Sequence, residues 1–223
     1  MKMLMALIGW GGLAFFSNAQ LCGQDYETRV AAIHKQAQNL KGEKPTLVLV
    51  GSSSFRFWPK TDTVFTGYDV INAGFGGSCF HDAWLLRDTL IYAFEPSVVL
   101  IYEGDNDLND GVAVEDILTG ATHLLDDLTR RLPMSELVVV APKASRARYH
   151  LKDQYLELNA GLRALAMDHG AHWVDFWLVQ HDAYGRLRDE LFIQDQLHLN
   201  DEGYAVWVNE LRRQLPWLDP NAR

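Results

Sequence analysis

Hydrophobic positions along this chain group into short continuous runs that alternate with longer stretches of helical periodicity. The continuous runs, rich in β-branched residues, cover residues 46–50, 68–71, 97–102, 136–141 and 172–176. Runs without polar alternation are typical of strands covered on both faces, as in a parallel sheet between helices. Apolar residues at helical spacing predict helices over residues 27–40, 80–94, 114–132, 153–169 and 202–215.

The alternation of strands and helices predicts an α/β fold. We expect a three-layer, doubly wound sandwich in which helices flank a five-stranded parallel sheet. In such a sheet the ligand site lies outside the carboxyl ends of the strands, where the strand order reverses. Residues that directly follow the strands are therefore the first candidates for chemistry.

Composition and charge narrow the class of protein. The 223 residues are 48% hydrophobic and 22% charged, which is ordinary for a globular domain and excludes a disordered or fibrous chain. The formal net charge of −9 and the pI of about 5.3 argue against a nucleic-acid or anionic-membrane partner. Two cysteines are too few for a disulfide framework, and no Cys/His cluster indicates a metal site.

The first 20 residues differ in character from the rest of the chain. Lys2 precedes an apolar stretch over residues 3–16, which is followed by Ser17, Asn18 and Ala19. This pattern predicts a secretory signal peptide cleaved after Ala19, and hence a periplasmic or secreted protein. Cleavage would remove one lysine and no acid, so the net charge would become −9 − 1 = −10.

Two alternatives stay open for this segment, and so does the pairing of the cysteines. An uncleaved membrane anchor needs about 20 apolar residues, more than residues 3–16 supply. A lipoprotein needs a leucine three residues before Cys22, where Ala19 stands. In an oxidising compartment Cys22 and Cys79 could form a disulfide, although the N-terminal stretch around Cys22 is expected to be mobile, which argues against it.

Polar motifs follow the predicted strands. They read GSSS at residues 51–54, NAGFGGS at 72–78 and GDND at 104–107, with DQLHLN at 195–200 near the C-terminus. Each has an ordinary structural explanation, because serines cap helices while glycine and Asx residues form tight turns. Together, however, they supply a serine nucleophile, a histidine base, a carboxylate that fixes the tautomer of that histidine, and donors for an oxyanion.

In their order and spacing these motifs resemble the four blocks of the SGNH (GDSL-like) hydrolase family, over residues 46–207 and closest to the branch whose first block reads GSSS. The resemblance implies that Ser53 is the nucleophile and that Asp195 and His198 complete a catalytic triad. It also implies that the backbone N–H groups of Ser53 and Gly77 and the amide of Asn106 form the oxyanion hole.

The first block departs from the family name. Ser52 stands where that name has Asp, and the serines on both sides of Ser53 leave open which one attacks. Taken with the signal-peptide pattern, the resemblance divides the chain into a signal peptide (1–19), an N-terminal lead-in and helix (20–44) and a single SGNH hydrolase domain (45–218).

The resemblance implies an ester hydrolase that forms an acyl-enzyme and uses neither a metal nor an organic cofactor. The expected partner is a small-molecule ester, with no nucleic acid and no stable membrane insertion after signal cleavage; the oligomeric state is left open. The expected activity is that of a short-acyl esterase or a carbohydrate O-deacetylase. The alternatives are a lysophospholipase or thioesterase and, more remotely, a catalytically silent binding protein on the same fold.

Three basic residues are candidates for binding an anionic part of the substrate. Arg56 follows the nucleophile, and Lys143 and Arg148 follow the fourth strand, whose carboxyl end should face the crevice. The alternative is a solvated loop whose charges never meet the substrate.

Overall fold

The computed structural model describes residues 21–23 and 26–218, so the predicted signal peptide lies outside the described residues. The five predicted strands are present and form one parallel sheet in the order β2-β1-β3-β4-β5. They are β1 (Thr46–Gly51), β2 (Asp69–Asn72), β3 (Val98–Tyr102), β4 (Glu136–Val140) and β5 (His172–Val174). The expected doubly wound parallel sheet is confirmed.

The order of the strands places a crevice between β1 and β3. The chain runs from β1 outward to β2 and then crosses back to β3 on the other side of β1, which is the reversal point where ligands bind in such sheets. Gly51 at the end of β1 pairs in register with Tyr102 at the end of β3. The segments that follow these two strands therefore leave the sheet side by side.

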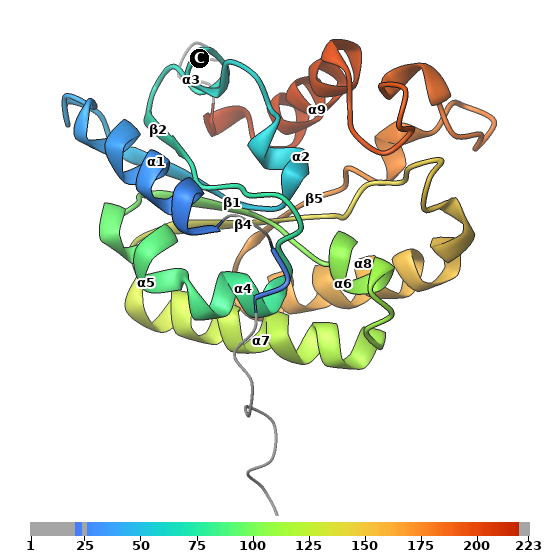
Figure 1. Ribbon diagram of the computed structural model, residues 1–223, viewed down its shortest axis with the longest axis horizontal. Helices are drawn as coiled ribbons and strands as arrows, with labels where there is room; N and C mark the ends of the chain where they lie inside the picture. The colour runs from blue at the N-terminus through green and yellow to red at the C-terminus, as the bar shows by residue number, and fades with distance from the viewer. Residues whose placement is uncertain (1–20, 24–25, 219–223) are drawn as a thin grey trace, which may run out of the picture.

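The two central strands account for the continuous apolar runs. Every residue of β3 is buried, as is every residue of β1 after Thr46. Both faces are covered by helices (Figure 1): α2 (Ser53–Arg56), α3 (Thr61–Val64) and α9 (Asp201–Gln214) lie on one side, and α4 (Phe80–Leu85), α5 (Arg87–Leu90), α7 (Val114–Arg131) and α8 (Lys152–Asp168) on the other.

The remaining helices are peripheral or short. The helix α1 (Tyr26–Gln38) packs against the edge strand β2 and reaches α5 through a 3.1 Å contact between the His34 ring and the Thr89 carbonyl. The short helix α6 (Asp105–Asn109) follows β3. Single turns of 3₁₀ helix also occur, at η1 (Tyr92–Phe94), η2 (Tyr149–Leu151), η3 (Leu178–Gln180), η4 (Asp189–Leu191) and η5 (Pro216–Leu218). Among the described residues no helix is both long and apolar enough to span a bilayer.

The prediction of one continuous helix over residues 80–94 is wrong. This stretch is divided into α4, α5 and η1, with a break at Leu86. The Arg87 guanidinium donates to the carbonyl of Trp84 and to the carboxylate of Asp127 on α7. A side chain thus satisfies a carbonyl at the end of α4, and the chain turns to follow α7.

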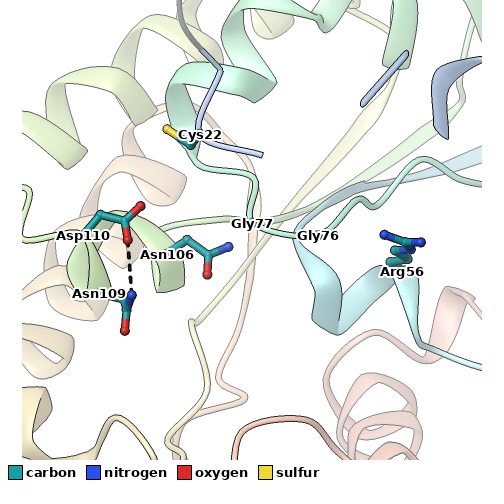
Figure 2. Close-up of a pocket in the computed structure, with 7 residues that line it drawn as sticks. All are labelled: Cys22, Arg56, Gly76, Gly77, Asn106, Asn109 and Asp110. Atoms are coloured by element: carbon teal, nitrogen blue, oxygen red, sulfur yellow. Dashed lines mark hydrogen bonds between the residues drawn. The ribbon is translucent and has the colours of Figure 1, made fainter. Parts of the chain in front are cut away.

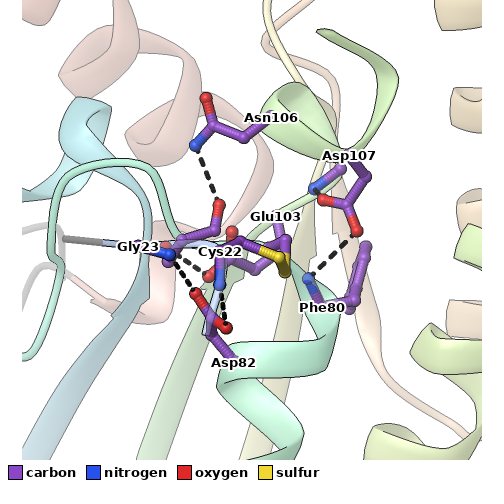
Figure 3. Close-up of a disulfide and its surroundings, with 10 residues drawn as sticks. Cys22, Gly23, Phe80, Asp82, Glu103, Asn106 and Asp107 are labelled. Atoms are coloured by element: carbon purple, nitrogen blue, oxygen red, sulfur yellow. Dashed lines mark hydrogen bonds between the residues drawn. A yellow bond between two sulfur atoms is a disulfide. The ribbon is translucent and has the colours of Figure 1, made fainter. Parts of the chain in front are cut away.

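A disulfide joins Cys22 to Cys79, 57 positions later in the sequence, so the argument against this pairing is wrong (Figure 3). The Asp82 carboxylate accepts the backbone N–H groups of Cys22 and Gly23, both at 2.8 Å. These contacts hold the lead-in beside Cys79. Because both sulfurs belong to the disulfide, the grouping of these cysteines with Asp82 is not a set of metal ligands.

Candidate active site

The nucleophile turn lies between β1 and α2. At Gly51 a Cβ atom would lie 2.4 Å from the carbonyl oxygen of Tyr102, so the turn has room only for glycine. The side chains of Ser52 and Ser54 are buried. The hydroxyl of Ser53, at the start of α2, instead lies 2.9 Å from Nε2 of His198. Of these three serines, Ser53 is the one that the structure brings to the histidine.

A carboxylate holds the other side of the His198 ring. Oδ2 of Asp195 lies 2.6 Å from Nδ1 of His198, and Oδ1 accepts the backbone N–H groups of Leu197 and His198, both at 2.9 Å. Partial burial raises the pKa of the Asp195 carboxyl, but the bonds from the His198 ring and backbone outweigh it and hold the pKa below its ordinary value. An ionised Asp195 fixes the Nδ1–H tautomer and leaves Nε2 free to accept the Ser53 proton.

The rest of the C-terminal motif fastens this loop to the nucleophile turn. The Asn200 side chain caps α9 by accepting the N–H of Gly203 at 3.0 Å. One residue further on, the Tyr204 hydroxyl donates to the carbonyl of Ser54 at 2.9 Å. The helix that follows the histidine is therefore bonded directly to the helix that carries the serine.

The glycine-rich loop after β2 passes close to the same turn. The side-chain amide of Asn72 donates to the Phe55 carbonyl at 2.6 Å. At Gly74 a Cβ atom would lie 2.6 Å from the backbone nitrogen of Arg56. Gly77 has a φ of 79°, in the left-handed region that favours glycine. The loop thus needs its glycines for close approach at one position and for backbone conformation at another.

Asn106 lies across from this loop on α6. Its Nδ2 donates to the carbonyl of Ser78 at 2.8 Å, and its Oδ1 accepts from Nη2 of Arg148 at 3.0 Å. A primary amide has two hydrogens on nitrogen, so one remains after the bond to Ser78. Asn106 and Gly77 line the same cleft (Figure 2).

This cleft has a volume of about 450 Å³ and a mostly polar wall. Its lining residues are Cys22, Arg56, Gly76, Gly77, Asn106, Asn109 and Asp110. The residue after Arg56 is Phe57, whose ring is half exposed and meets the His198 ring edge to face at 5.1 Å. The site thus combines hydrogen-bonding groups with one accessible aromatic face.

The prediction that Lys143 binds substrate is wrong. Its side chain is fully buried, and its Nζ lies 3.2 Å from Oδ2 of Asp105. Arg148 has Nη1 on Asp105 and Nη2 on Asn106, so protein groups occupy both nitrogens. Of the three basic candidates, Arg56 is the one that lines the cleft.

The buried partner of these two cations is Asp105. Nothing in the sequence indicated this role, because the motif GDND is typical of an ordinary Asx turn. Burial alone would raise the pKa of Asp105, but the charges of Lys143 and Arg148 hold it well below its usual range. The lead-in was expected, but its contribution to the site was not: Cys22 is part of the cleft wall. Cys79 lies two residues after Gly77 in the sequence, so a disulfide from Cys22 to Cys79 would have indicated that the lead-in comes close to the site.

A parallel α/β sheet with a Ser–His–Asp chain at its reversal point defines the class of α/β serine hydrolases. Residues 42–206 match the GDSL-like lipase/acylhydrolase family. The chain belongs to this family and is an ester hydrolase of the GDSL type. Among curated proteins none matches the sequence.

Solved structures share the fold at low sequence identity. A candidate platelet activating factor from Streptococcus pneumonia is 20% identical, with a TM-score of 0.74 over 87% of this chain and 92% of that one. A GDSL-like lipase from Bacteroides thetaiotaomicron is 19% identical, with a TM-score of 0.67 over 85% and 96%. An acetylxylan esterase from Geobacillus stearothermophilus is 14% identical, with a TM-score of 0.65 over 76% and 93%.

Proposed function

We propose that this enzyme cleaves carboxylic esters through an acyl intermediate on Ser53. The observation that carries the proposal is the hydrogen-bond chain from Asp195 through His198 to Ser53, with lengths of 2.6 and 2.9 Å. These lengths lie within the range for proton transfer between a nucleophile and its base.

In the first half-reaction His198 takes the Ser53 proton as the serine oxygen attacks the ester carbonyl carbon. The negative charge that develops on the carbonyl oxygen is stabilised by the N–H groups of Ser53 and Gly77 and the amide of Asn106. The C–O bond to the alcohol then breaks, and His198 gives its proton to the leaving alcohol. In the second half, water gives a proton to His198 as its oxygen attacks the acyl carbon. The bond between the acyl carbon and the Ser53 oxygen then breaks, His198 returns the proton to Ser53, and the acid is released.

The preferred substrate that we propose is a short-acyl ester, with an O-acetylated carbohydrate as the leading case. The cleft wall presents an arginine, two asparagines and an aspartate, which suit a polar substrate better than an acyl chain. The Phe57 ring lies against His198, the group that protonates the leaving alcohol. An aromatic face at this position offers a stacking surface to a sugar ring.

Labelling and substrate profiling together test this proposal. A fluorophosphonate probe should label the wild type and Ser54→Ala but not Ser53→Ala, which should also lose several orders of magnitude in turnover. Failure to label the wild type would favour a silent binding protein. In a series of p-nitrophenyl esters beside acetylated xylooligosaccharides, activity should fall with acyl length; a maximum at long chains would favour a lysophospholipase or thioesterase.

We also propose that the protein is exported after cleavage behind Ala19. The Cys22–Cys79 disulfide supports this, because disulfides persist in oxidising compartments. The intact mass of protein recovered outside the cytoplasm should lack residues 1–19. A mass that includes Met1 would contradict cleavage.

A further inference from the structure

A buried ionic cluster lies behind the candidate oxyanion hole. At its centre is Asp105, whose side chain is 4% exposed. Its carboxylate accepts from four side chains: Tyr102, Lys143, Arg148 and Tyr155. These partners come from the end of β3 (Tyr102), the segment after β4 (Lys143 and Arg148) and α8 (Tyr155), so the position of Asp105 is fixed from three parts of the fold.

One member of this cluster reaches out of it to the active site. Arg148 donates from Nη1 to the carboxylate and to the backbone carbonyl of Asp105, at 2.6 and 2.8 Å. From Nη2 it donates to Oδ1 of Asn106 at 3.0 Å. A planar guanidinium held on one edge can present the other edge in only one orientation.

The bond to Oδ1 decides which way the Asn106 amide faces. An amide flipped by 180° would place its NH₂ against Arg148, donor against donor, and its oxygen against the Ser78 carbonyl, acceptor against acceptor. In the observed orientation one N–H binds Ser78 and the other is left for the cleft. The positive charge of Arg148 also polarises the amide and makes its N–H groups better donors.

We propose that Arg148 is a positioning residue for ester hydrolysis: it acts through Asn106, whose amide it orients toward the oxyanion, and Asp105 is the anchor that holds it in place. This inference rests on the proposed function, in which Asn106 donates to the oxyanion. It replaces the sequence-based expectation that Arg148 binds the substrate itself.

A double-mutant cycle between Arg148 and Asn106 tests the proposal. Arg148→Lys keeps a positive charge near Asp105 but lacks the fork that spans Asp105 and Asn106. Loss of one oxyanion donor lowers kcat by about 10²- to 10³-fold, so a misdirected donor should lower it by about ten- to a hundredfold, with KM little changed. In the Asn106→Ala background the same substitution should have almost no further effect, because its route to the reaction is gone. Arg146→Lys is the matched control, since Arg146 is exposed and pairs with Asp189 instead.

Two results would overturn the proposal while leaving the proposed function intact. One is an equal loss of kcat from Arg148→Lys in both backgrounds, which is what a purely structural role predicts. The other is an Arg148→Lys enzyme as active as Arg146→Lys. A wild type that neither hydrolyses esters nor reacts with a fluorophosphonate would instead refute the proposed function.

A second variant keeps the test available if Arg148→Lys does not fold. Arg148→Met leaves Asp105 paired with Lys143, a neutral pair that still receives the hydroxyl of Tyr155. Melting temperatures of all variants separate loss of fold from loss of activity. The same cycle with Arg148→Met should again show its effect only where Asn106 is present, and an effect independent of Asn106 would overturn the proposal.

Discussion

Replacing Asp195 by asparagine should abolish most activity by moving a single proton. In the wild type Oδ1 of Asp195 accepts two backbone N–H groups, and Oδ2 faces Nδ1 of His198. An asparagine must keep its carbonyl toward the two backbone donors, so its NH₂ will face Nδ1. That nitrogen must then accept, and the ring proton moves to Nε2, where it faces Ser53 and blocks proton transfer.

The magnitude follows from the lost base. A wrong-tautomer substitution in such a triad lowers kcat by about 10⁴-fold, which at about 1.4 kcal/mol per factor of ten corresponds to about 5.5 kcal/mol of transition-state stabilisation. Folding should change little, because the Asp195 side chain is 42% exposed.

Steady-state hydrolysis of p-nitrophenyl acetate measures the loss of activity, and ¹⁵N chemical shifts of His198 locate the proton directly. Asp189→Asn, an exposed carboxylate that pairs with Arg146, is the control. An Asp195→Asn enzyme with more than about a tenth of wild-type kcat, or one with the proton still on Nδ1, would refute the tautomer argument.

Further predictions concern stability and specificity. Cys79→Ser should lower the free energy of unfolding by about 4 kcal/mol in urea denaturation, from the closure entropy of the loop, and reductant should reproduce the loss in the wild type only. Burial, and then the Asp107 carboxylate, raises the pKa of Glu103 well above its usual range. As pH rises, the unfolded chain therefore releases this proton at a lower pH than the folded chain, and the stability contributed by the protonated carboxyl is lost above about pH 4.5. Glu103→Gln should flatten the resulting decline of melting temperature with pH. An unchanged slope of melting temperature against pH would contradict this prediction. Arg56→Ala should raise KM for an anionic ester by about ten- to a hundredfold while sparing p-nitrophenyl acetate, whereas equal effects on both esters would exclude a charge contact.

Elements whose pattern is local could be predicted from the sequence. The runs around Val48 and Val99 have no polar alternation because both strands lie between helices, and that cause is visible in the strands themselves. The order of the motifs likewise indicated that Ser53 and His198 would meet, and the structure places them 2.9 Å apart.

Features that depend on distant partners could not be read in this way. Lys143 sits in a stretch with two arginines and looked like part of a basic surface loop, but Asp105 from another segment draws it into the interior. The break after Leu85 depends on Asp127, which holds Arg87 from α7. In each case a charge pair between segments far apart in the sequence overrides the local pattern.

The wall of the cleft comes partly from the N-terminal lead-in, which lies outside the residues that match the family. The family match begins at residue 42, yet Cys22 forms part of the cleft wall. In addition, the guanidinium of Arg29 on α1 donates to the carbonyls of Asn72 and Gly74 at 2.7 and 2.8 Å. A homologue that kept the matched region but carried another lead-in would retain the same catalytic residues and would have a substrate cleft with a different lining. Exchange of this terminal segment would therefore change the substrate specificity of the enzyme and leave the catalytic residues as they are.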